Sequence, residues 1–278
     1  MRVINTFDRI PDCFINGRFD LEAWRAYTRM VSDELSQKCE QDAKGYDFDK
    51  QVLPVVARVQ ADKEAALLAN ASFTSVAKRL ESRLCPLFQR EPELDLILYL
   101  GLCNGAGWAT TLEGREAVLV GIEKVLELGW QTEDKMQALI FHEIGHIWHK
   151  TYGTFELHPR TKGEASLVQL YKEGVAMVCE QILCQNENAY HQDEDGWLAW
   201  CVAHQAEIKR EYQKRVDNHT STQDFFGDWC RYKSHSDVGY YLGCEFVKYL
   251  RRRRSLAEIA NLELHELFRQ FKAFSSSA

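Results

Sequence analysis

The chain has 278 residues, of which 45% are hydrophobic and 27% charged, a balance typical of a soluble globular protein with enough length for a substantial core. Its net charge of −7 argues against a general nucleic-acid-binding protein, because phosphate backbones attract basic surfaces. The nine cysteines form no Cys-x-x-Cys pair, and no apolar run resembles a signal peptide or approaches the ~18 residues of a membrane span. We therefore expect a protein of the reducing cytoplasm with neither membrane nor nucleic-acid partners.

The first third of the chain, residues 1–90, is predicted to be mainly helical. Asp20 is a suitable N-cap for a helix over about 21–44, and a second helical stretch rich in Ala, Leu, Lys and Glu covers about 51–83. Neither stretch carries a chemical motif. We expect this region to be scaffold or the wall of a substrate cleft, forming one compact unit with a catalytic domain over 91–278.

Two short strands are predicted after this region. Residues 94–100 form a mostly apolar run typical of a buried strand, and residues 116–121 form a second one, preceded by a turn at Glu113-Gly114. Glycines at 101, 105 and 107 indicate a loop after the first strand. The strands could offer an exposed edge to an extended peptide, or they could form a hairpin that only covers a neighbouring helix.

The segment 132–153 contains the motif His-Glu-x-x-His, made by His142, Glu143 and His146. Thr132 is a suitable N-cap, acidic residues follow it, and apolar residues recur at helical spacing, so the segment is predicted to be a helix. Helical spacing places both imidazoles on one face, where their nitrogens can reach one metal ion, while Glu143 can reach a water on that metal. The alternative is a core helix with a solvated histidine face.

The next predicted helix, over about 164–184, carries Glu173 on the flank of its apolar stripe. A carboxylate beside a packing surface needs a compensating partner, because its burial without one is costly. A metal ion held by the preceding helix would be such a partner, whereas the alternative is a solvated glutamate on a helix edge. His149 and the loop residues Glu156 and His158 compete with Glu173 for the place of a third ligand.

The sequence Phe-His142-Glu143-Ile-Gly-His146, followed on the next helix by Glu173-Gly174-Val-Ala, resembles the gluzincin class of zinc metallopeptidases. It is most similar to bacterial zinc-dependent proteases of the peptidase MA-like group. The resemblance covers about residues 94–255. It implies that His142, His146 and Glu173 bind Zn²⁺ and that Glu143 is the general base.

Two related patterns fit less well. The thermolysin pattern has a shorter gap before its third ligand and a downstream Asp that this chain lacks. The metzincin pattern requires Gly and His where this chain has His149 and Tyr152. We therefore expect an α+β, mostly helical zincin-like fold, in which a small sheet packs against the helix that carries the motif.

A pair of tyrosines, Tyr240 and Tyr241, opens a helix predicted over about 237–251. In the families that this chain resembles, the tyrosine of a Tyr-x-x-Gly sequence at this point in the chain donates its hydroxyl to the tetrahedral intermediate. The resemblance implies this role for Tyr240, which lies three residues before Gly243. Tyr241 is the alternative, and without the resemblance both would be ordinary core residues. The four arginines that follow complement the dipole of the helix C-terminus, so they do not indicate nucleic-acid binding.

Together these residues predict zinc-dependent hydrolysis of a peptide bond in a peptide or protein substrate. The metal would acidify a water, and Glu143 would take its proton and pass it to the leaving amine. Two alternatives are hydrolysis of a non-peptide amide, and a regulatory protein whose metal site binds a partner without turnover. The intact Glu143 argues against the second, because a structural metal site needs no base. No pattern indicates a particular oligomeric state.

Overall fold

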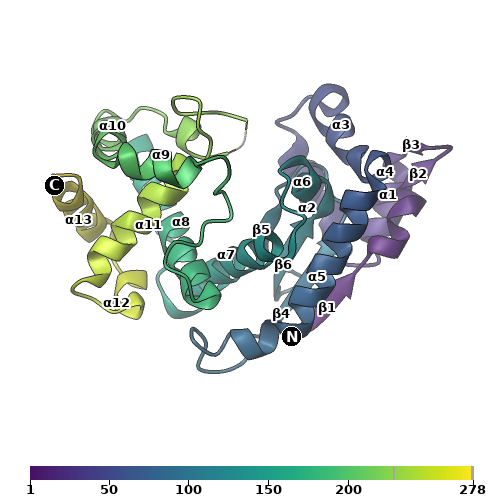
Figure 1. Cartoon of the computed structure of the whole chain (residues 1–278), viewed down its shortest axis with the longest axis horizontal. Helices are drawn as coiled ribbons and strands as arrows, with labels where there is room; N and C mark the ends of the chain where they lie inside the picture. Colours follow the sequence, from purple (N-terminus) through teal and green to yellow (C-terminus); the bar gives the residue numbers. More distant parts are fainter. Residues whose placement is uncertain (228, 277–278) are drawn as a thin grey trace. The chain divides into compact units, whose positions relative to one another are not determined.

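The computed structural model of the chain describes residues 1–227 and 229–276. Helices predominate, and the strands form one four-stranded mixed sheet and one two-stranded sheet, which confirms the predicted α+β class. The chain contains two compact units, Met1–Glu143 and Ile144–Ala278, coloured purple to teal and green to yellow in Figure 1. Their division falls inside the continuous helix α7 (Glu133–Tyr152).

The first unit contains the four-stranded sheet, with strand order β1-β4-β6-β5. Its strands are β1 (Arg2–Asn5), β4 (Leu94–Tyr99), β5 (Gly107–Leu112) and β6 (Arg115–Gly121). The two predicted strands are confirmed as β4 and β6, which pair in parallel. β1 also pairs in parallel with β4, with Ile4 opposite Ile97, so the N-terminal residues complete the same sheet.

Strand β5 lies at the edge of this sheet and pairs antiparallel with β6. It begins at Gly107, so the loop that we predicted from the glycines ends earlier than expected. The predicted turn is present: Glu113 and Gly114 have φ values of 48° and 79° between the two strands. Two residues with positive φ are typical of the tight hairpin turns that match the twist of antiparallel strands.

The helices of the first unit are shorter than the sequence pattern predicts. They are α1 (Leu21–Thr28), α2 (Leu35–Ala43), α3 (Leu53–Val56), α4 (Arg58–Ala61), α5 (Lys63–Arg83) and α6 (Ile122–Glu127). Asp20 caps α1 as predicted, by accepting the Ala23 N–H at 2.8 Å. Asp62 accepts the Ala65 N–H at 3.0 Å and starts α5 anew, which divides the predicted second stretch. An aspartate that bonds local backbone in this way favours a helix start over a helix interior.

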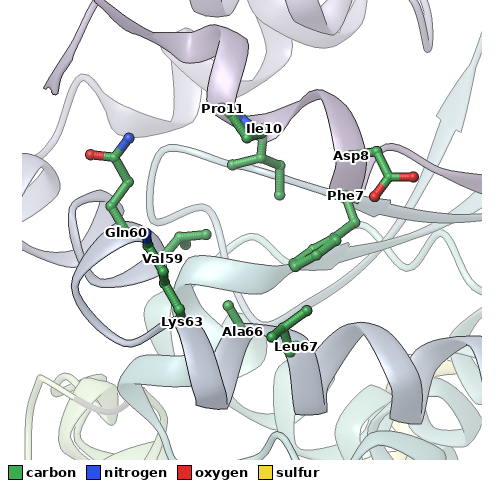
Figure 2. A pocket seen from close by; sticks show the side chains of 9 residues that line it. All are labelled: Phe7, Asp8, Ile10, Pro11, Val59, Gln60, Lys63, Ala66 and Leu67. Atoms are coloured by element: carbon green, nitrogen blue, oxygen red, sulfur yellow. The ribbon is translucent and has the colours of Figure 1, made fainter. Parts of the chain in front are cut away.

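A pocket of about 400 Å³ lies in the first unit, beside α4 and α5. It is lined by Phe7, Asp8, Ile10, Pro11, Val59, Gln60, Lys63, Ala66 and Leu67. Figure 2 shows the side chains of Phe7 and Ile10 facing the space across from Leu67. The lining is therefore mainly apolar, and its charged members are Asp8 and Lys63.

The second unit is helical. Its helices after α7 are α8 (Lys162–Cys184), α9 (Trp197–Ala203), α10 (Gln205–Asp217), α11 (Val238–Arg251), α12 (Leu256–Ala260) and α13 (Leu264–Ser276). A capping box formed by Thr161 and Glu164 starts α8. Within the described ranges, no helix of either unit combines the length and the apolar character that crossing a membrane requires.

Helices α8 and α11 are in backbone contact through two glycines, Gly174 and Gly243. A Cβ atom added at Gly174 would collide with the carbonyl group of Gly243. A Cβ atom added at Gly243 would lie 2.5 Å from the carbonyl oxygen of Leu170 and 3.1 Å from Cα of Gly174. The absence of both side chains therefore determines how closely α11 packs on α8.

We expect Gly174→Ala to lower the free energy of unfolding by about 1–3 kcal/mol, because the new methyl group must push α11 away from α8. Urea unfolding followed by circular dichroism measures this change. Gly45→Ala is the matched control, since a Cβ atom there meets nothing within 4 Å. Equal stability of the two variants would contradict the close packing of α8 on α11.

Candidate metal centre

The motif lies on helix α7, which spans Glu133–Tyr152 as the sequence predicts. The N–H of Met136 bonds the carbonyl of Thr132 at 2.9 Å, and the helix ends just before Gly153. His142 and His146 are therefore one turn apart on a single continuous helix. His142 and Glu143 are both buried.

Helix α8 runs close beside the second half of α7 because two small residues face each other. A Cβ atom added at Gly145, inside the motif, would lie 2.8 Å from Cα of Ala176 and 2.9 Å from its carbonyl oxygen. This approach brings Nε2 of His146 to 3.3 Å from Oε2 of Glu173. The side chains of His146 and Glu173 are 14% and 17% exposed, so the pair is within reach of solvent.

His142, His146 and Glu173 form a group that could hold a metal ion, since each offers a ligand atom and these atoms all lie within 4.8 Å of one another. Zinc binds histidine nitrogen and carboxylate oxygen at about 2.0–2.2 Å, which in a tetrahedron separates two ligand atoms by roughly 3.4 Å. The 3.3 Å between His146 and Glu173 matches that separation. Two imidazoles and one carboxylate are also a donor set that zinc accepts in catalytic sites with an open fourth position.

The other three candidates for the third ligand lie outside the group of His142, His146 and Glu173. Glu156 and His158 are exposed on the loop between α7 and α8, and neither belongs to the candidate metal groups found among the described residues. His149 is buried, with its ring edge-on to Phe155 at 5.3 Å and to Tyr171 at 4.9 Å. Burial, with a smaller contribution from His146, lowers the pKa of His149 to about 3, so it is a neutral packing residue.

Glu143 is held by the edge strand of the first unit. The backbone N–H of Ala109 in β5 donates to Oε2 of Glu143 at 2.8 Å. Gly107 lies beside the same carboxylate, and a Cβ atom there would be 2.5 Å from Oε1. One carboxylate oxygen is thus fixed by the backbone, and the glycine that begins β5 leaves room for the other.

A second candidate group shares His142 and contains Glu180 and His191, which our reading of the sequence missed. The backbone N–H of His191 bonds Oε1 of Glu180 at 3.1 Å, and Nδ1 of His191 lies 2.8 Å from Oε2. Both residues are buried. The sequence spacing could have pointed to Glu180, because it follows Glu173 by two helical turns and both therefore lie on the same face of α8.

The two tyrosines at the start of α11 differ in their surroundings. Tyr240 is partly exposed, with its ring 6.2 Å from that of His191 and 5.7 Å from that of Phe226. Tyr241 is buried against Tyr190 and Trp197. Of the pair, Tyr240 is therefore the one that lies beside the buried Glu180–His191 cluster.

The chain was compared with family models, with curated proteins and with solved structures, and none of them matches it. The arguments for its function therefore depend on the geometry described above.

We expect purified protein to contain one tightly bound zinc ion per chain, measured by elemental analysis. His146→Ala and Glu173→Gln should each lose most of it, because each removes one of three protein ligands. His158→Ala is the control and should keep the metal, since this exposed residue belongs to neither candidate group. Full zinc content in Glu173→Gln would show that another residue is the third ligand.

Proposed function

We propose that the protein is a zinc-dependent peptidase. The observation that carries the proposal is the grouping of His142, His146 and Glu173 on α7 and α8, with Glu143 next to the first ligand in the sequence. The two imidazoles and the Glu173 carboxylate would hold the ion. Bound zinc would supply an acidified water and an electrophile for a carbonyl oxygen.

Glu143 acts as the general base in this proposal. Its Oε2 accepts the N–H of Ala109, which fixes the orientation of the carboxylate. Oε1, next to Gly107, is then the oxygen that accepts the proton of the attacking water and later delivers it to the leaving amine. A base held by backbone needs no rearrangement before it accepts the proton.

Tyr240 is the proposed donor to the carbonyl oxygen of the substrate as negative charge develops there. Its partial exposure and its position beside His191 support this role. The alternative donor is the next residue, Tyr241, which is buried. A phenol hydroxyl is a neutral donor, and its hydrogen bond becomes stronger as the oxygen becomes charged.

An extended peptide is the proposed substrate because of the position of β5. This strand forms the edge of its sheet, and the Ala109 N–H that reaches Glu143 points away from the partner strand β6. An edge strand offers backbone donors and acceptors to which an added strand can pair. A peptide paired along β5 would thus be close to Glu143 in the same unit.

Turnover of a mixed peptide library tests this function. The zinc-loaded protein should cleave peptides, a chelator should stop the cleavage, and mass spectrometry of the products identifies the bonds that are cut. A zinc-loaded protein that cleaves no peptide would contradict the proposal and would favour either hydrolysis of another amide or a metal site without turnover.

We expect Glu143→Gln to keep its zinc but to lose turnover by about 10²–10⁴-fold, the usual cost of removing a general base. The amide can still accept the N–H of Ala109 through its oxygen, so the fold should be preserved. Kinetics on a cleaved peptide, with metal content measured on the same sample, provide the test. Loss of zinc in this variant would mean that Glu143 is a ligand instead.

We expect Tyr240→Phe to fold and bind zinc normally while kcat falls by about 10²-fold or more, the typical effect of losing one oxyanion donor. Tyr241→Phe is the matched control, because it removes the same hydroxyl from the buried neighbour. Full activity of Tyr240→Phe together with an inactive Tyr241→Phe would assign the role to Tyr241. Full activity of both would show that neither tyrosine acts in the reaction.

A further inference from the structure

The connection between β4 and β5 has to cross the end of β6. The strand order β1-β4-β6-β5 places β6 between these two strands, so residues 100–106 pass the point where β6 ends and α6 begins. A segment that leaves a sheet in this way loses the strand neighbours that would accept its backbone N–H groups, and a buried N–H without an acceptor is costly. The loop therefore needs acceptors from outside the sheet.

Glu123, in the first turn of α6, supplies these acceptors. Its Oε2 accepts the N–H of Gly101 at 2.8 Å, and its Oε1 accepts the N–H of Cys103 at 3.2 Å. The side chain is fully buried. Burial raises the pKa of Glu123 to about 7, and the hydrogen bonds from the loop oppose this shift. The carboxylate thus keeps a costly position in which each of its oxygens holds one N–H of the loop.

Glycines on both sides let the loop lie directly on the start of α6. A Cβ atom added at Gly101 would be 2.5 Å from Oε1 of Glu123, and one added at Gly121 would be 2.6 Å from the carbonyl oxygen of Gly105. The N–H of Gly121 also bonds the carbonyl of Ala106 at 3.0 Å. The loop is therefore held at its beginning and at its end, immediately before β5 begins.

The first residues of β5 are the ones that contact Glu143. The N–H of Ala109 donates to Oε2 of Glu143 at 2.8 Å, and a Cβ atom at Gly107 would lie 2.5 Å from its Oε1. The orientation of this carboxylate therefore depends on where β5 starts. That start is fixed by the pairing of β5 with β6 and by the loop that Glu123 holds.

We infer that Glu123 is a positioning residue for Glu143, acting through the loop 100–106 and the first residues of β5. One buried carboxylate of the first unit fixes the strand, and the strand fixes the second carboxylate. The catalytic consequence rests on the proposed function, in which Glu143 is the general base. The hold on Glu143 itself can be measured without turnover.

Hydrogen exchange of the Ala109 amide, followed by NMR, tests this hold. In Glu123→Gln the side-chain nitrogen cannot accept an N–H, so the loop loosens and the Ala109 N–H should exchange about 10-fold faster or more. Gly101→Ala should act in the same direction, because its methyl group would displace the Glu123 carboxylate from the loop. This second variant provides the answer if Glu123→Gln does not fold.

Peptide cleavage tests the catalytic consequence. The kcat of zinc-loaded Glu123→Gln should fall by on the order of 10-fold to 10²-fold, because a small displacement of a catalytic group is enough for such a loss. Zinc affinity, measured by competition with a chelator, should not change. Combined with Glu143→Gln, the substitution should lower kcat no further, because the group that it positions is already absent. A general loss of stability would not produce this coupling.

Asp95→Asn is the matched control. Asp95 is another buried carboxylate of the first unit, and it pairs with Arg2 and Arg115 near the start of β4, whereas the loop follows the end of that strand. Its substitution should lower the thermal midpoint but leave the exchange of Ala109 and kcat unchanged. The control therefore separates lost stability from a specific effect on Glu143.

The outcomes distinguish this inference from the proposed function. Unchanged exchange of Ala109 in both Glu123→Gln and Gly101→Ala would overturn the inference. Equal losses of kcat in Glu123→Gln and Asp95→Asn would also overturn it, since they would indicate a general loss of stability. If the wild type cleaves no peptide, the proposed function is wrong, and the exchange of Ala109 still decides whether Glu123 positions Glu143.

Discussion

The close approach of α7 and α8 at Gly145 and Ala176 is the contact on which the candidate site depends. A side chain larger than hydrogen at Gly145 would meet the backbone of α8 within 3 Å, so the spacing of the two helices is set at this point. His146 and Glu173 each lie near the contact in sequence, and this spacing places their polar atoms at the separation of two zinc ligands.

Helix α8 contacts different neighbours on different sides. These contacts account for the residue types in the sequence Glu173-Gly174-Val-Ala176. Glu173 points to His146, Gly174 allows backbone contact with α11, and Ala176 allows backbone contact with α7. Adjacent residues on a helix point in directions about 100° apart, so four consecutive positions can serve three neighbours. The candidate ligand Glu173 is thus placed by a helix that is packed on two other sides.

Local signals account for what the sequence predicted. A capping residue and helical periodicity located α7, helical periodicity alone located α8, and the apolar runs located β4 and β6. Each of these signals lies within or next to the element that it predicts. The pairing of β1 with β4 joins residues more than 90 positions apart, and no local pattern reports it. Gly107 was interpreted as a loop residue because its partner, the Glu143 carboxylate, is also distant in sequence.

The Glu180–His191 pair shows the same limit within the site itself. Glu173 and Glu180 are two helical turns apart, so their side chains project from the same face of α8. Nothing in the sequence indicates that one of them is partly exposed and the other fully buried. Depth follows from the segment that carries His191, which covers Glu180 and supplies two hydrogen bonds to it. A carboxylate near solvent can exchange its partners with water, whereas one enclosed by donors is desolvated and depends on those donors. Burial, not residue type or spacing, therefore distinguishes the two carboxylates.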